Sequence, residues 1–190
     1  MPMPTPPLLA RAADSVLVIV DIQQRLLPVM PAAGSEHMLR NVRILAESAA
    51  RLAVPILVTE QYPSGLGPTV APVLEAMPPA VPRIAKTCFS CSASPEFTAA
   101  LAACFRSQIV LAGMEAHVCV LQSAMELRAA GREVWVAEDA CCARNPANLR
   151  NAMDRMRSAG VVITNTESVV FEWLRDARHD HFKAISALVR

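Results

Sequence analysis

The sequence has almost no net charge and no long apolar run. Its 18 Lys and Arg residues are nearly balanced by 17 Asp and Glu residues, which leaves a net charge of +1 over 190 residues. A protein that binds nucleic acid through a basic face needs a clear excess of positive charge, so the composition disfavours that class. No stretch of 18 apolar residues is present, so the sequence predicts neither a transmembrane helix nor a membrane partner.

The N-terminal residues also lack the features of a secretory signal. Residues 1–7 contain four prolines, without the basic segment and the apolar segment that such a signal needs. We expect residues 1–13 to form a flexible, proline-rich tail and residues 14–190 to form one domain. The expected location is cytoplasmic, where the six cysteines would be reduced thiols rather than disulfides.

Short aliphatic segments alternate with longer helical segments along the chain. This order is typical of βαβ units and predicts a doubly wound, mainly parallel α/β sheet with helices on both faces. The expected strands cover residues 16–20, 56–59, 83–85, 109–112, 133–137 and 161–164. The expected helices cover residues 35–53, with Ser35 as the N-cap, and 94–103, 118–130, 146–159, 167–177 and 182–189. Residues 62–81 are predicted to form a long Pro- and Gly-rich loop that borders a site.

Two reactive side chains follow predicted strands. Asp21 comes directly after the first strand, where a carboxylate is a helix cap, a hydrogen-bonding group or a catalytic group. Cys119 lies near the start of a predicted helix, whose positive end lowers the pKa of a thiol. Ligands of doubly wound sheets bind beyond the carboxyl ends of the strands, so both positions favour chemistry. Taken alone, a cysteine between Val118 and Val120 is more often a small buried residue.

Three motifs occur in one order along the chain: DIQ at Asp21, KTCFS at Lys86, and GMEAHVCV, which contains Cys119. Together they resemble the isochorismatase-like cysteine hydrolases over about residues 16–170, and most closely the isochorismatase domain-containing proteins. The resemblance implies a Rossmann-like three-layer fold, a small-molecule substrate and a homo-oligomer. It also implies hydrolysis of a small amide or a related acyl compound.

The same resemblance assigns a role to each motif. Cys119 would be the nucleophile that forms a thioester, Asp21 the general base, and Lys86 the cation that favours the thiolate and holds the carboxylate. The family also has a cis peptide bond in the turn before the nucleophile, which falls here between Met114 and Glu115. The backbone N–H groups of Glu115 and Cys119 would then form the oxyanion hole.

Histidine is missing from the segment in which the related nicotinamidases bind a metal. That segment reads TEQYPSGLGPTV here, so the expected enzyme uses neither a metal nor another cofactor. Isochorismate vinyl-ether hydrolases of the family lack the cysteine, so its presence favours acyl chemistry. The residues expected to line the substrate pocket are Gln23, Gln61, Tyr62, Leu66 and Met114.

Two other functions are compatible with the sequence. The chain could be a noncatalytic or scaffolding member of the same fold, although Asp21, Lys86 and Cys119 are all present. Cys88 and Cys91 form a CxxC pair, which could serve a thiol redox protein. No second pair follows at zinc-finger spacing, so structural thiols are the preferred interpretation of this motif.

Overall fold

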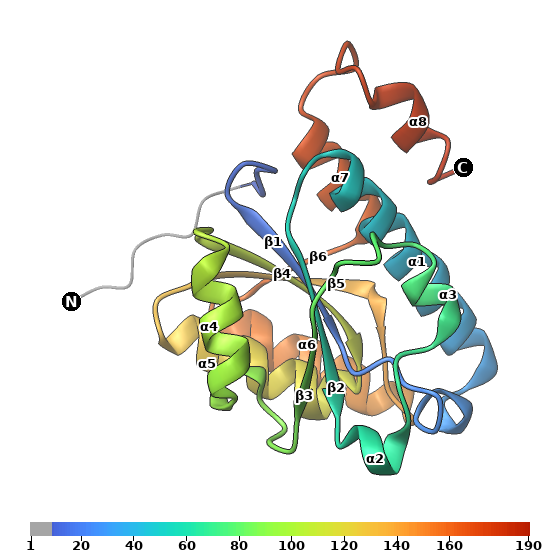
Figure 1. Ribbon diagram of the computed structural model, residues 1–190, viewed down its shortest axis with the longest axis vertical. Coiled ribbons are helices and arrows are strands. Elements are labelled where there is room, and N and C mark those ends of the chain that lie inside the picture. Colours follow the sequence, from blue (N-terminus) through green and yellow to red (C-terminus); the bar gives the residue numbers. More distant parts are fainter. Residues whose placement is uncertain (1–8) are drawn as a thin grey trace.

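The computed structural model describes residues 9–190 and contains one sheet of six parallel strands (Figure 1). The strands are β1 (Ser15–Val20), β2 (Ile56–Gln61), β3 (Arg83–Lys86), β4 (Gln108–Met114), β5 (Glu133–Cys142) and β6 (Val162–Thr164). Their order in the sheet is β3-β2-β1-β4-β5-β6. The direction of winding therefore reverses between β1 and β4, which is where doubly wound sheets bind ligands.

Helices cover both faces of the sheet (Figure 1). One face packs against α1 (Ala32–Arg51), α3 (Ala71–Leu74), α7 (Thr166–Leu174) and α8 (Phe182–Ser186). The other packs against α4 (Pro95–Ala103), α5 (Leu121–Ala129) and α6 (Pro146–Ser158). The doubly wound α/β fold predicted from the sequence is confirmed.

The side chains of β1 alternate between two apolar cores. Leu17 and Ile19 belong to the core under α1, whereas Val16 and Val18 belong to the core under α4 and α5. All four are fully buried, because helices cover the strand on both faces. Asp21 directly follows this strand, so its carboxylate lies at the carboxyl edge of the sheet.

The first helix begins three residues before the predicted N-cap. α1 starts at Ala32, directly after Pro31, and no side chain caps it. Ser35 lies inside the helix, where its hydroxyl donates to the carbonyl of Ala32 at 2.9 Å. The prediction was wrong because Pro31, with φ fixed at −56°, provides the helix start without a capping side chain.

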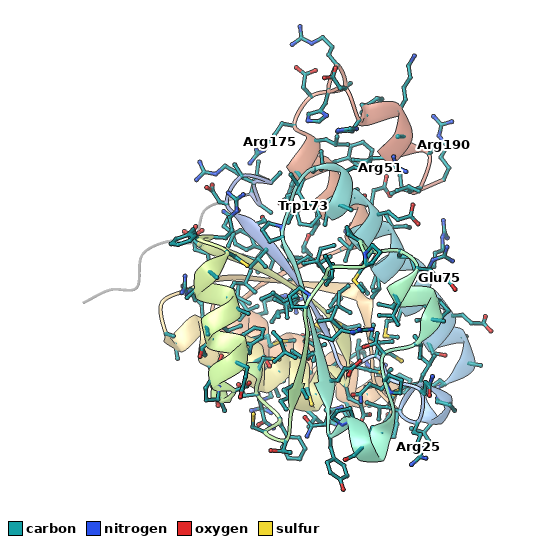
Figure 2. The ribbon with its side chains drawn as sticks, in the orientation of Figure 1. Arg25, Arg51, Glu75, Trp173, Arg175 and Arg190 are labelled. Atoms are coloured by element: carbon teal, nitrogen blue, oxygen red, sulfur yellow. The ribbon has the colours of Figure 1, made fainter. Side chains whose placement is uncertain are left out.

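The segment between β2 and β3 is more regular than the predicted loop over residues 62–81. It contains α2 (Pro63–Leu66) as well as α3. Glu60 Oε1 accepts the backbone N–H of Thr69 at 2.8 Å and its hydroxyl at 2.7 Å. Arg25, labelled beside α2 in Figure 2, donates from Nη1 to the carbonyl of Gly65 at 2.9 Å. These bonds fasten the segment to the carboxyl edge of the sheet.

Part of the predicted N-terminal tail is packed into the domain. Ala10 is fully buried, and its N–H donates to Oε2 of Glu172 at 2.6 Å. The N–H of Arg11 donates to Oε1 of Gln108 at 2.7 Å. The folded domain therefore includes Ala10 rather than starting at residue 14, while residues 1–8 lie outside the described part. No helix within residues 9–190 combines the length and apolarity needed to cross a bilayer.

Gly113 allows β4 to approach β1 closely. Its φ is 125°, and a Cβ atom at this position would lie 2.2 Å from the carbonyl oxygen of Val20. We expect Gly113→Ala to lower the free energy of unfolding by about 2–3 kcal/mol, measured by urea denaturation. Gly34→Ala inside α1 is the control, because its added Cβ would meet only Cys142 Sγ at 3.4 Å. Equal losses for the two variants would contradict a special role for the contact between β4 and β1.

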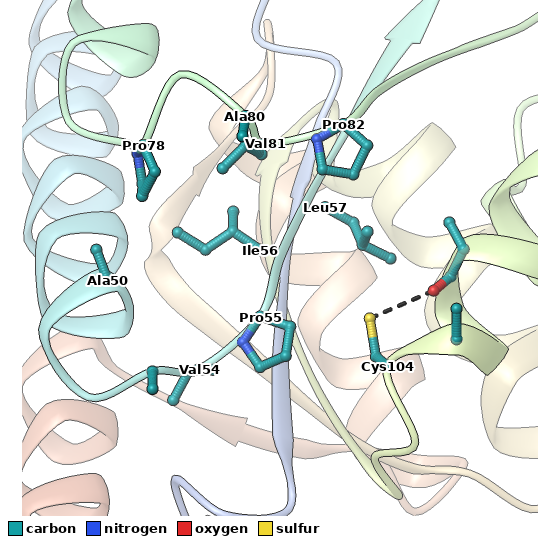
Figure 3. A pocket seen from close by; sticks show the side chains of 13 residues that line it. Ala50, Val54, Pro55, Ile56, Leu57, Pro78, Ala80, Val81, Pro82 and Cys104 are labelled. Carbon is teal, nitrogen blue, oxygen red and sulfur yellow. Dashed lines mark hydrogen bonds between the residues drawn. The ribbon is translucent and has the colours of Figure 1, made fainter.

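An apolar hollow of about 590 Å³ lies at the opposite edge of the sheet, where the strands begin (Figure 3). Ile56 and Leu57 of β2 form part of its wall, and pairing with β3 starts only at Val58. Cys104 is the one titratable side chain among the described residues that line this hollow. Because Asp21 lies at the other edge of the sheet, this hollow is separate from the site described next.

Candidate active site

Asp21 and Lys86 form an ion pair that is sealed from solvent. Lys86 Nζ lies 2.7 Å from Asp21 Oδ2, and both side chains are 0% exposed. Thr59 of β2 donates from Oγ1 to the other carboxylate oxygen, Oδ1, at 2.7 Å. The carboxyl ends of β1, β2 and β3 lie at the same edge of the sheet, which explains how residues 65 positions apart come into contact.

The ammonium group of Lys86 has several acceptors around it. Besides Asp21, it donates to Gln61 Oε1 at 2.7 Å and to the carbonyls of Phe89 at 3.1 Å and Cys88 at 3.3 Å. Burial lowers the pKa of Lys86, but the negative charge of Asp21 is the largest of the causes that raise it, and the rise prevails. The pKa therefore lies above its usual value of 10.5, and Lys86 is charged at neutral pH.

Cys119 lies beside this ion pair, within the π-helical turn η3 (Ala116–Val120) that precedes α5, and is 5% exposed. Burial is the largest cause that raises the pKa of its thiol well above the usual range. The charge of Asp21 and a hydrogen bond to its carboxylate raise this pKa further, and Lys86 only partly opposes them. The resting Cys119 is therefore a protonated thiol beside Asp21. The expectation that the helix start lowers this pKa was wrong, because burial and the carboxylate dominate.

Glu115 lies between β4 and η3, and its backbone N–H is expected to face an oxyanion together with that of Cys119 inside η3. The peptide bond between Met114 and Glu115 is cis. The carbonyl of Glu115 accepts the N–H groups of Val118 at 3.0 Å and Val120 at 3.3 Å. Its carboxylate accepts both the backbone N–H and Nε of Arg144 at 3.0 Å. Glu115 is thus held at both its main chain and its side chain.

Arg144 follows β5, and no sequence motif singles it out. We expect Arg144→Ala to lower the free energy of unfolding by about 1–2 kcal/mol, because the Glu115 side chain is only 7% exposed and would lose a charged donor. Arg157→Ala is the matched control, since its partner Asp154 is 74% exposed, and should cost less than about 0.5 kcal/mol. Thermal and urea denaturation measure the free energy of unfolding of both variants. Similar losses in the two variants would contradict the expectation that burial of Glu115 strengthens its contact with Arg144.

Two residues predicted to line a pocket are fully buried instead. Met114 belongs to the apolar core under α1. The side chain of Gln23 donates to the carbonyls of Gln61 at 3.0 Å and Gly67 at 2.6 Å, and accepts the N–H of Gln61 at 2.7 Å. Gln23 therefore braces the end of β2 against α2 and has no free polar atom for a substrate. Their place in a substrate pocket therefore stays a prediction, although neither side chain is exposed in this structure.

Of the other three predicted pocket residues, Tyr62 lines a second hollow of about 590 Å³, which borders Lys86. Tyr62, 56% exposed, lines it together with the end of β3 and the start of α4. Leu66 is not among its lining residues. Gln61 is not among them either, because its amide holds Lys86 and donates to the carbonyl of Thr87 at 2.7 Å. Lys86 is part of the wall of this hollow, whereas Asp21 and Cys119 are not.

All six cysteines are unpaired. Within the CxxC motif, Cys91 is fully buried and its Sγ lies 3.8 Å from Thr59 Oγ1. The charged groups that act on Cys91 are Asp21 and Lys86. The preferred interpretation of the CxxC motif was structural thiols, and the fold turns Cys91 towards the ion pair. No group of three His, Cys, Asp or Glu side chains within residues 9–190 is arranged to hold a metal ion.

Most of the chain matches a model of a known protein family. The model described as the Isochorismatase domain matches residues 15–168. The chain belongs to the isochorismatase family. Isochorismatase domain-containing protein 2A of Mus musculus is 36% identical over 180 residues, which cover 93% of this chain and 83% of that protein.

Solved structures of related proteins share the fold of this isochorismatase family member. A structure of the MAR1 ribonuclease of Caenorhabditis elegans has a TM-score of 0.89 and 30% identity, covering 95% of this chain and 92% of that one. YcaC of Escherichia coli, described as an octameric hydrolase of unknown specificity, has a TM-score of 0.89 and 27% identity, with coverages of 96% and 90%. YcaC of Pseudomonas aeruginosa, solved with hexane-2,5-diol and covalent acrylamide, has a TM-score of 0.86 and 28% identity, covering 96% of each chain. The chain is a member of the isochorismatase-like cysteine hydrolase superfamily.

Proposed function

We propose that this isochorismatase family member is a metal-independent cysteine hydrolase that acts on a small amide or a related acyl compound. The observation that carries the proposal is the fully buried ion pair of Asp21 and Lys86, whose carboxylate raises the pKa of the Cys119 thiol beside it. A nucleophile, a base that can take its proton, and a cation that orients the base are thereby in one place.

The first half of the reaction forms a thioester. Asp21 takes the proton of Cys119 while the sulfur attacks the substrate carbonyl carbon, which gives a tetrahedral oxyanion. The N–H groups of Glu115 and Cys119 donate to that oxyanion. The intermediate collapses, the C–N bond breaks, and the leaving nitrogen takes the proton back from Asp21. The amine departs and the acyl group stays on Cys119.

The second half of the reaction hydrolyses the thioester. Asp21, again a carboxylate, takes a proton from water as the water oxygen attacks the thioester carbon. The C–S bond breaks, the Cys119 sulfur recovers the proton from Asp21, and the carboxylic acid leaves. Lys86 keeps its proton in every step, because its pKa is raised, and stabilises the negative charge that moves between Asp21 and Cys119.

A trapping experiment tests this function. The protein is incubated with a panel of small amides, carbamates and esters, and covalent adducts are located by mass spectrometry of peptides. Acrylamide is included because it is covalently attached in the structure of YcaC from Pseudomonas aeruginosa. We expect adducts at Cys119 and hydrolysis of at least one compound in the panel.

Two variants make the trapping experiment specific. Cys119→Ala should lose both the adduct and the hydrolysis, while Cys104→Ala, in the apolar hollow at the other edge of the sheet, should keep both. Absence of any reaction that depends on Cys119 would instead support a noncatalytic member of the fold. A disulfide between Cys88 and Cys91 after mild oxidation would support the redox alternative.

We also propose that the chain forms a homo-oligomer. The support is the octameric state stated for YcaC of Escherichia coli, a relative of the same fold at 27% identity. Light scattering coupled to size-exclusion chromatography measures the mass in solution, and a mass of one chain at every concentration would contradict this part.

A further inference from the structure

Cys91 is a buried thiol that the proposed reaction does not use. It is the first residue of the short helix η2 (Cys91–Ala93). Its thiol donates a weak hydrogen bond to Thr59 Oγ1 over 3.8 Å, and the Thr59 hydroxyl donates in turn to Oδ1 of Asp21 at 2.7 Å. Three side chains from three elements thus form a hydrogen-bond chain that ends on the proposed base.

The direction of this chain follows from which groups carry protons. Burial, followed by the charge of Asp21, raises the pKa of Cys91 to about 11, although the charge of Lys86 opposes the rise. Cys91 therefore remains a thiol at neutral pH and acts as a donor. A threonine hydroxyl rotates freely and both donates and accepts. A donor on the Thr59 oxygen leaves the Thr59 hydrogen free to point at Asp21.

The backbone of Cys91 is tied to the nucleophile as well. Its N–H donates to Ser123 Oγ at 2.8 Å, and Ser123 donates to the carbonyl of Cys119 at 2.6 Å. Ser123 lies in the first turn of α5, which continues from the turn that holds Cys119. One buried set of bonds therefore connects the main chain of the proposed nucleophile to the carboxylate of the proposed base.

We propose that Cys91 and Thr59 are positioning residues that keep a hydrogen-bond donor on Oδ1 of Asp21 and thereby set how strongly this carboxylate binds a proton. The inference rests on the proposed role of Asp21 as the base. The other groups that face Asp21 are Lys86 from β3, bound to Oδ2, and Cys119 from η3. Removing the donor from Oδ1 leaves these groups in place and makes proton binding by the carboxylate more favourable.

Replacing Thr59 provides the main test. Thr59→Val has nearly the same shape but no hydroxyl, whereas Thr59→Ser keeps the hydroxyl. We expect Thr59→Val to move the acid limb of the Cys119–acrylamide reaction, plotted as rate against pH, upward by about one pH unit. Below that limb the rate would fall about tenfold. Thr59→Ser should restore the wild-type limb, while a purely structural defect would lower the rate at every pH without moving the limb.

A double-mutant cycle tests whether Cys91 acts through Thr59. Cys91→Ala should move the limb in the same direction, with a rate about two- to threefold lower on its acid side. In the Thr59→Val background, Cys91→Ala should cause no further movement, because the link to Asp21 is already absent. Cys88→Ala is the matched control from the same CxxC motif and should leave the limb unchanged. If the shifts caused by Cys91→Ala and Thr59→Val added in the double variant, the relay from Cys91 through Thr59 to Asp21 would be refuted. An equal shift from Cys88→Ala would refute it as well.

An infrared titration separates this inference from the proposed function. The carboxylate band of Asp21 is identified by its loss in Asp21→Asn, and its disappearance on acidification is followed in the wild type and in Thr59→Val. A band that titrates at higher pH in Thr59→Val supports the relay even if Cys119 does not react. Unchanged titration refutes the relay even if Cys119 is shown to be the nucleophile.

Discussion

Lys86→Met is expected to lower the free energy of unfolding by about 3–5 kcal/mol, because it leaves the carboxylate of Asp21 buried without its cation. Methionine has nearly the same length, so the loss measures charge rather than packing. The raised pKa of Lys86 sets the pH range of this effect. The stabilisation is fully present below the usual lysine pKa of 10.5 and is lost as the pH rises through the higher folded value. Urea denaturation from neutral to alkaline pH measures the difference.

Two further variants make the Lys86 result decisive. Lys183→Met removes the chain's other lysine, which is exposed on α8, and should change stability by less than about 0.5 kcal/mol. The double variant Asp21→Asn with Lys86→Met contains no unpaired buried charge and should recover much of the loss. A loss in the double variant equal to the sum of the two single losses would contradict a direct interaction between the side chains.

Asp21→Asn is expected to slow acyl transfer to Cys119 by about 10²–10⁴-fold, because the amide has the shape of the carboxylate but does not take the thiol proton. Cys119 is held as a thiol, so the loss of the base cannot be offset by thiolate already present. Single-turnover formation of the acyl adduct measures the effect on the first half of the reaction.

The control for this variant is Asp154→Asn, whose side chain is 74% exposed on α6. It should react at the wild-type rate. If Asp21→Asn also reacted at that rate, Asp21 would not be the base, although it would remain the partner of Lys86. Circular dichroism on both variants checks that the fold is retained before rates are compared.

The layout of the sheet could be predicted because each strand has a simple local signal. Residues 16–20 are continuously apolar, and the structure shows why: β1 is central and covered on both faces. The position of Asp21 at the carboxyl edge follows from the same pattern. The motif resemblance predicted that Lys86 and Cys119 act together with Asp21, and the structure places both beside it.

Other features depend on packing that the sequence does not reveal. Met114 and Gln23 were expected in a pocket. Met114 packs in the apolar core, and the side-chain amide of Gln23 donates hydrogen bonds to backbone carbonyls of neighbouring segments. The pKa of Cys119 was expected to fall because of the helix start, yet burial determines its direction. Arg144 and Thr59 escaped notice because their contacts cross from one strand to the next.

The protonated resting state of Cys119 has a consequence for the durability of the protein. Thiolates react with peroxide and with stray electrophiles, whereas thiols are far less reactive. In the proposed reaction, a sulfur that keeps its proton until a substrate lies beside Asp21 is spared most of this damage. A protonated, buried Cys119 is therefore expected to resist oxidation better than an exposed thiolate would.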